Sequence, residues 1–253
     1  MSTRDRTRVV SLVLALVALA GCVSDAEPPP AVAALQQIER VLGHGPAGEL
    51  VVTSIDWTAP SGADGADHLS LAWRDAVGVL RPLTLAVPAI DARVWRGDAV
   101  VLGTDARLLR VGAAGVEVLA VDVLGELAVS DDGSALAYVT SQGELGDLHV
   151  ATYAGDAVVA RGLQSAGRVR FTPDGAGLLF VGALRGGVAG VLWAPLDGTS
   201  ALRSITNGAL RSGRPWGEAF VPSPGTAQDF AFDGDVVRWA ANGAIVERTW
   251  RQL

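Results

Sequence analysis

Short runs of alternating apolar and polar residues, separated by turn residues, make up most of the chain after residue 49. The pattern is clearest in segments 127–155 and 169–198, where an apolar run, an Asp-Gly turn and two further apolar runs end at a Gly. Alternation with a period of two is typical of β-strands. Asp-Gly between two such runs favours a hairpin, because Gly accepts a positive φ. The turn glycines Gly133 and Gly175 lie 42 residues apart.

The repeat can be followed five times through its third strand and the Gly that closes it. These glycines are spaced by 37, 40, 43 and 45 residues, at Gly78, Gly115, Gly155, Gly198 and Gly243. A period of roughly 40–45 residues is typical of a four-stranded β-propeller blade, and rings of roughly 4–8 blades are usual. We therefore predict an all-β domain over 49–253 with about five four-stranded blades. The first unit lacks a clear inner strand before Leu50, and no strand that closes the ring is evident.

One segment carries a family resemblance. Val169-Arg-Phe-Thr-Pro-Asp-Gly175, Gly177-Leu-Leu-Phe-Val181 and the Leu192-Trp193 pair resemble the repeat of TolB-type β-propellers. Segment 127–155 matches the same repeat with Asp131 in place of the proline. The resemblance implies a propeller, and it implies contact with partner lipoproteins through one propeller end. It does not fix an activity, because such repeats occur in binding modules, enzymes and transport accessories.

Residues 1–21 have the features of a lipoprotein signal peptide. Three Arg in the first eight residues precede the apolar run Val9–Ala20, which is too short to span a bilayer. The sequence Leu-Ala-Gly-Cys over 19–22 resembles the bacterial lipobox, which implies cleavage before Cys22 and lipid on that residue. The alternative is an ordinary secretory signal. We favour lipidation, because the single Cys of the chain stands where the lipobox requires it.

Residues 22–48 are predicted to connect this anchor to the propeller. The prolines at 28–30 favour an extended tether. Apolar residues spaced by three and four predict a short helix over 31–42, which either caps the propeller or is a loosely docked linker. We expect the protein on the outer face of a bacterial envelope membrane, either the outer membrane or the cell surface, held through the lipid on Cys22.

Composition and charge narrow the function classes. The chain has 253 residues and a formal net charge of −7, which argues against a nucleic-acid partner because such a partner needs a basic face. The sequence contains no Gly-x-Ser-x-Gly, His-Glu-x-x-His or P-loop motif. None of its three His has a second ligand at metal-site spacing. We therefore expect no metal site, no cofactor and no catalytic residue, and the oligomeric state is not indicated.

The turns that recur in the repeat are the candidate binding site, since equivalent turns should lie on one face. Asp131, Asp132 and Asp174 occupy such turns, where turn chemistry already accounts for them. Loops on a rigid scaffold nevertheless concentrate binding residues. Trp216 lies in Arg-Pro-Trp-Gly at 214–217, at the equivalent turn position, and an exposed Trp is a candidate contact. A Trp that folds back onto the ring is the plainer alternative.

Two functions remain open. The first is an envelope-anchored, non-catalytic module that binds a protein, another ligand or a glycan. The alternative is a polysaccharide- or peptide-degrading hydrolase or lyase with acids around the central channel, for which only Asp91 and Glu126 are candidates. Two carboxylates that converge with Arg or His at a channel mouth would favour the enzyme, whereas a lining of Ala, Val and Gly would disfavour it. His149 alternates with apolar neighbours and is expected on the solvent side or between blades.

Overall fold

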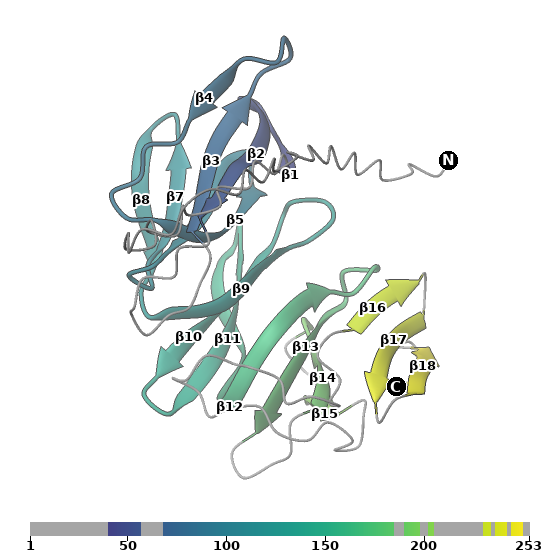
Figure 1. Ribbon diagram of the computed structural model, residues 1–253. Coiled ribbons are helices and arrows are strands. Elements are labelled where there is room, and N and C mark those ends of the chain that lie inside the picture. The colour runs from purple at the N-terminus through teal and green to yellow at the C-terminus, as the bar shows by residue number, and fades with distance from the viewer. Residues whose placement is uncertain are drawn as a thin grey trace, which may run out of the picture. The chain divides into compact units, whose positions relative to one another are not determined.

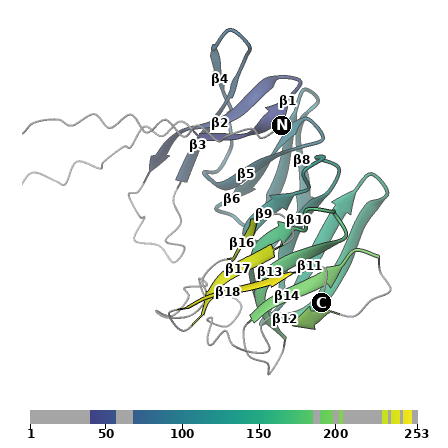
Figure 2. The same cartoon turned by 90° about the vertical axis from the view of Figure 1, so that its right-hand side faces the viewer.

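The computed structural model describes residues 40–56, 68–184, 190–197, 202–204, 230–233, 236–241 and 244–249. These residues form three antiparallel sheets, whose strand order can be followed in Figure 1 and Figure 2. No helix occurs among them, and therefore none that is long and apolar enough to cross a membrane. The predicted all-β class is confirmed for this part of the chain.

The first sheet holds two consecutive four-stranded units. The first unit contains β1 (Arg40–Gly45), β2 (Gly48–Asp56), β3 (His68–Arg74) and β4 (Leu80–Pro82), and the second contains β5 (Ala89–Trp95), β6 (Asp98–Gly103), β7 (Leu108–Gly112) and β8 (Gly115–Ala120). Strands that follow each other within a unit pair antiparallel. One residue pair, Leu69 with Ala89, joins the two units into a single sheet.

The second sheet repeats the arrangement, and the third is shorter. The second contains β9 (Val123–Val129), β10 (Leu136–Gln142), β11 (Leu145–Thr152), β12 (Gly155–Phe171), β13 (Gly177–Leu184), β14 (Gly190–Pro195) and β15 (Arg203–Ser204), and the third contains β16 (Phe230–Asp233), β17 (Val236–Ala241) and β18 (Ala244–Thr249). The 17-residue strand β12 pairs first with β11 and then with β13. It is therefore both the last strand of the third unit and the first strand of the fourth.

The predicted repeat is confirmed over the first four units. Gly78, Gly115 and Gly155 lie at the turns between the third and fourth strands, with φ angles of 87°, 114° and 131°. These backbone angles are accessible to Gly at little cost, which explains why the repeat closes on that residue. Gly198 and Gly243 lie outside the described residues. The fifth unit is represented by the described strands β16–β18, so the number of blades and the closure of a ring stay predictions.

The inner strand that the sequence did not reveal is β1. It pairs with β2 through Arg40–Val52 and Gly45–Gly48, upstream of Glu49. The predicted helix over 31–42 is therefore wrong for its last three residues, 40–42, and its other residues lie outside the described part of the chain. Pairing with a neighbouring strand satisfies the backbone of this segment, which a spacing of apolar residues alone does not show.

The hydrophobic core lies between successive units. Leu50, Leu71 and Val101 belong to a cluster between the first and second units, and Trp95, Leu108 and Leu136 belong to one between the second and third. Of the three clusters in the described part of the chain, the one between the third and fourth units is the largest, and it includes Leu148, Leu163, Leu178 and Phe180. Each unit thus buries its apolar faces against its neighbours, as expected of a repeat that cannot form a core alone.

Candidate functional site

The first strands of the four units lie next to one another, β1 beside β5, β5 beside β9, and β9 beside the second part of β12. We refer to these four segments as the first strands. A bulge or register shift interrupts each of them, at Val41/Gly43, at Ala89/Asp91, near Gly125 and between Gly167 and Arg170. Bulges redirect side chains and occur often beside functional sites. Arg168 has a φ of 54° at the last bulge, a conformation that costs a non-Gly residue about 1 kcal/mol or more.

Charged residues flank the buried positions of the first strands. Ala92, Leu127 and Val169 are completely buried, and strand alternation places the residues on either side of each on the opposite face. These flanking residues include five charged side chains, namely Asp91 and Arg93 on β5, Glu126 on β9, and Arg168 and Arg170 on β12. The two acids are the catalytic candidates that the sequence indicated. The three arginines were not predicted, although the alternation around Ala92 and Val169 was sufficient to indicate them.

Asp91 links two first strands through its carboxylate. Its Oδ2 atom accepts a hydrogen bond from the backbone N–H of Leu127 at 2.8 Å. Its Oδ1 atom accepts one from the backbone N–H of Ala92 and forms an ion pair with the Arg93 guanidinium. Burial raises the pKa of Asp91 above its ordinary value, against the opposing effects of Arg93 and of the two backbone N–H groups.

Glu126 makes the equivalent link to the fourth unit. Its Oε1 atom is paired with Nη1 of Arg168, and its Oε2 atom accepts a hydrogen bond from Nη1 of Arg170 at 3.3 Å. The carboxylates of Asp91 and Glu126 are close enough that the charge of Glu126 contributes to the raised pKa of Asp91. The first strands therefore bring two acids and three arginines together, and every carboxylate oxygen already has a partner.

A hollow of about 810 Å³ lies along these strands and is called the first-strand hollow below. It is lined by residues 40–44, Arg93, Val94, 127–133, Arg170, Phe171 and Pro173. All four first strands contribute to it, together with the turns that follow β9 and β12. Its volume falls within the range of roughly 300–1,000 Å³ that is usual for ligand sites.

The predicted turn residues divide into two groups. Asp132 and Asp174 brace their own turns, because the Oδ1 atom of each accepts a hydrogen bond from the hydroxyl two residues before it, at 2.6 and 2.7 Å, and from a backbone N–H two residues after it. The Ser130 hydroxyl, followed by the N–H and hydroxyl groups of Ser134, lowers the pKa of Asp132 to about 2. These contacts confirm the turn chemistry, and Asp174 does not line the first-strand hollow.

Asp131 is placed differently. It is exposed, it lines the first-strand hollow, and no hydrogen bond or ion pair of its carboxylate is found within the described residues. Of the four proposed binding residues, Asp131 and Asp132 are thus brought to one hollow. Trp216 lies outside the described residues.

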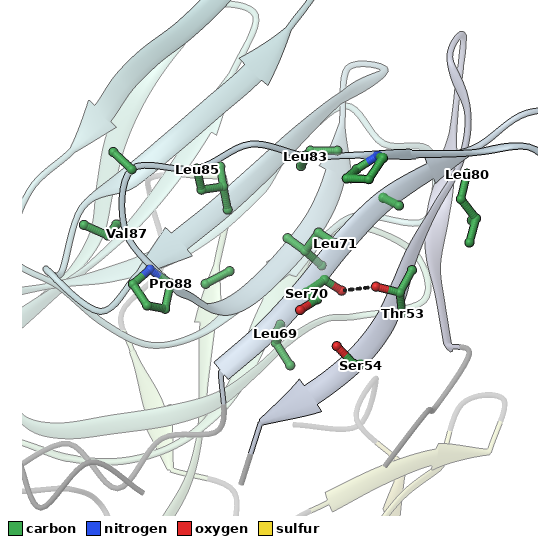
Figure 3. A pocket seen from close by; sticks show the side chains of 14 residues that line it. Thr53, Ser54, Leu69, Ser70, Leu71, Leu80, Leu83, Leu85, Val87 and Pro88 are labelled. Atoms are coloured by element: carbon green, nitrogen blue, oxygen red, sulfur yellow. Dashed lines mark hydrogen bonds between the residues drawn. The ribbon is translucent and has the colours of Figure 1, made fainter. Parts of the chain in front are cut away.

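Two further hollows carry less chemistry. One, of about 670 Å³, is bounded by β2, β3, β4 and the chain before β5, and its labelled side chains are mostly apolar (Figure 3). Its polar contacts include a 3.2 Å hydrogen bond from the Thr53 hydroxyl to the Ser70 carbonyl, drawn as a dashed line in Figure 3. The other, of about 410 Å³, surrounds His44, Glu49 and Arg74. Arg74 and Glu49 in its lining form an ion pair with each other.

His149 belongs to a network of side chains within the third unit. Its ring stacks on Tyr138, a member of the cluster between the second and third units. Its Nδ1 atom lies 2.8 Å from Oδ2 of Asp156, and its Nε2 atom lies 3.0 Å from the Thr140 hydroxyl. The order hydroxyl, imidazole, carboxylate is that of a nucleophilic triad. Thr140 is buried and lines none of the three hollows, so this network joins strands.

No group of three or more His, Cys, Asp and Glu side chains among the described residues is arranged to hold a metal ion.

Comparisons with known proteins concern the fold. No family model matches the sequence, and no curated protein matches it. Solved structures that resemble the chain include TolB from Acinetobacter baumannii, with 14% identity and a TM-score of 0.45 over 73% of this chain and 47% of TolB. They also include hydrazine synthase from Kuenenia stuttgartiensis, with 11% identity and a TM-score of 0.50 over 80% of this chain and 61% of that one. The chain thus spans about half of the TolB structure, and at these identities the likenesses are likenesses of fold alone.

Proposed function

We propose that this protein is a lipid-anchored protein of the bacterial envelope whose repeat domain is a non-catalytic binding module. The observation that carries the proposal is the first-strand hollow, which four consecutive units build together and which opens beside the predicted turn face. A rigid scaffold that gathers polar and apolar side chains around one hollow is suited to recognition. The site residues in this proposal are Asp131 and Asp132, which line the hollow, together with Asp174 and Trp216, which the sequence predicts at equivalent turn positions.

The support for the anchor comes from the sequence alone, because residues 1–39 lie outside the described part of the chain. A positive segment, a short apolar run and the lipobox ending at Cys22 occur in the order that lipid attachment needs. Several acyl chains on one residue provide stable membrane attachment, whereas one chain does not. Cys22→Ala should release the protein from the membrane fraction, and a variant that still sediments with membranes after a salt wash would refute the anchor.

Binding is tested by crosslinking and recovery from native envelope. Wild-type protein should retain one or a few envelope components, whereas Asp131→Lys should lose them because it replaces the carboxylate acceptor at the rim of the hollow, unpaired within the described residues, by a longer side chain that has no acceptor. Glu117→Lys is the matched control, because Glu117 is an exposed acid on the outer strand β8. Trp216→Ala tests the proposed contact made by Trp216. Circular dichroism must first show that each variant folds, and equal recovery by all four proteins would refute the site.

The alternative function, a hydrolase or lyase, is favoured by one observation. Asp91 and Glu126 lie close to each other and pair with three arginines, as the enzyme hypothesis expects, but neither acid lines any of the three hollows. The hydrogen-bond partners of both carboxylates argue for a structural role, because a general acid or base needs an oxygen free to exchange a proton with substrate. Turnover of an envelope polysaccharide or peptide by wild type, lost in Glu126→Gln, would overturn the binding proposal.

A further inference from the structure

Arg93 and Arg170 are equivalent residues of the second and fourth units. Each follows a completely buried residue, Ala92 or Val169, on its first strand. The Nη1 atom of each donates a hydrogen bond to the carbonyl of that preceding residue, at 2.7 Å for Arg93 and 2.8 Å for Arg170. The same Nη1 atom also bonds a carboxylate, Asp91 in one unit and Glu126 in the other. In both units, Nη1 of the arginine is thus held by the preceding carbonyl and by a carboxylate, which lies on the same strand for Arg93 and on the neighbouring strand for Arg170.

These contacts occupy one nitrogen of each guanidinium. Within the described residues, the Nε and Nη2 atoms of Arg93 and Arg170 have no hydrogen-bond partner, and both side chains line the first-strand hollow. The Arg93 side chain is 22% exposed and that of Arg170 is 39% exposed. An arginine that is fixed at one nitrogen and open at the others presents a preformed fork for a planar anion.

The charges around the hollow are arranged asymmetrically. Arg40, Arg93 and Arg170 line its strand side, whereas its acids, Asp131 and Asp132, lie on the turn after β9. One oxygen of Asp132 is already held within that turn. The remaining lining includes Val94 and Phe171, which offer apolar contacts. A ligand with a few carboxylates among apolar groups matches this lining, while a long polyanion would be repelled by a protein with a net charge of −7.

We infer that the first-strand hollow binds an acidic peptide segment, whose carboxylates accept hydrogen bonds from Nε and Nη2 of Arg93 and Arg170. The inference rests on the proposed binding function and names the class of its ligand. Amino-acid side chains supply carboxylates next to apolar groups, and the peptide N–H groups supply donors for the Asp131 carboxylate. Carboxylate and guanidinium planes pair through two parallel hydrogen bonds, which gives this recognition its geometry.

The test is selection from a random peptide display library on immobilised wild-type protein. Enriched peptides should contain more Asp and Glu than the starting library. Their synthetic versions should bind about tenfold more weakly to Arg170→Gln and to Arg93→Gln, since hydrogen bonds to charged groups contribute energies of that order. Replacing Asp and Glu in the peptides by Asn and Gln should have the same effect. Binding should also weaken as salt is added.

Three controls separate recognition from folding. Arg110→Gln removes an arginine on β7 that pairs with Asp98 and Glu117 outside the hollow, and its peptide binding should equal that of wild type. Arg93→Lys keeps the charge next to Asp91 but loses the planar fork, and it should also bind weakly if the fork is the contact. The thermal unfolding midpoint of each variant shows whether its fold is intact.

The outcomes for this inference and for the proposed function are distinguishable. Enrichment without excess acidic residues, unchanged binding by the Arg93 and Arg170 variants, or no enrichment at all would overturn the acidic-peptide inference. If the envelope crosslinking experiment still recovers a component that Asp131→Lys loses, the binding function stands with a ligand of another class. If neither experiment recovers a ligand, both are wrong.

Discussion

The backbone N–H of Leu127 donates a hydrogen bond to Oδ2 of Asp91 at 2.8 Å. The two residues are far apart in sequence, and each lies next to a bulge in the first strand of its unit. A bulge leaves a backbone group without its ladder partner, and here a side chain from the preceding unit supplies the acceptor. The irregularity of one strand is thereby satisfied by its neighbour, which couples adjacent units through polar contacts as well as through their apolar faces.

Asp91→Ala should therefore destabilise the domain by about 1–3 kcal/mol, because it leaves the completely buried Leu127 without an acceptor for its N–H. Urea unfolding of the soluble Cys22→Ala protein measures the loss. Glu117→Ala serves as the control, since its ion pair with Arg110 is exposed and should contribute about 0–1 kcal/mol. Equal losses of unfolding free energy in the two variants would show that the hydrogen bond between Asp91 and Leu127 stabilises the domain no more than an exposed ion pair does.

Asp132 should make stability depend on acid pH. Its pKa in the folded protein, about 2, lies below its ordinary value of 3.8. The ionised form is therefore favoured by folding, and its stabilising contribution is complete above pH 3.8 and is lost as the pH falls toward 2. The thermal unfolding midpoint of Asp132→Asn should therefore fall less steeply than that of wild type as the pH is lowered from 3.8 toward 2. Equal dependence on pH in wild type and Asp132→Asn would contradict this assignment.

The Thr172 hydroxyl is predicted to be the essential part of its turn. It is buried, it donates to Asp174 at 2.7 Å, and it accepts from the Gly177 N–H at 3.0 Å. Thr172→Val should cost about 1–3 kcal/mol, because a buried N–H loses its acceptor. Thr172→Ser should be nearly neutral, since Ser130 makes the same contacts in the third unit. Equal losses for Val and Ser, measured by urea unfolding, would contradict this assignment.

Local chemistry accounts for what the sequence predicted correctly. The turns at Gly133 and Gly175 form as expected because Ser130 and Thr172 hold them through contacts between near neighbours. The strand β1 was missed because Leu35, Ile38 and Leu42 are spaced like a helix face, while its pairing with β2 depends on the rest of the sheet. The spacing of apolar residues indicates which face of a segment is apolar, but it does not indicate which strand is available to pair with that segment.

The candidate site was harder to predict for the same reason. Asp91 and Glu126 were recognised as acids on inner strands, but Arg168 and Arg170 reach Glu126 from more than forty residues away in sequence. Their meeting requires that the first strands of the third and fourth units lie side by side, and it requires the bulges that turn the side chains. Neither is encoded in a local pattern, whereas the alternation within β12 was sufficient to place both arginines on one face.

The Arg96 guanidinium lies between two aromatic rings, 4.0 Å from the ring centroid of Trp95 and 3.9 Å from that of Tyr153. Trp95 and Arg96 come from the second unit and Tyr153 from the third, and Trp95 Nε1 also donates to the Ser134 carbonyl at 3.3 Å. Nε and Nη2 of Arg96 are buried without a hydrogen-bond partner among the described residues, so stacking must offset much of their lost hydration.

We predict a coupling energy of about 0.5–2 kcal/mol between Arg96→Gln and Tyr153→Leu in a double-mutant cycle of urea unfolding. Arg96→Lys with Tyr153→Leu should give a smaller coupling, because an ammonium does not stack as a plane. A coupling near zero in the first cycle would show that Tyr153, which is 77% exposed, does not help to join the two units.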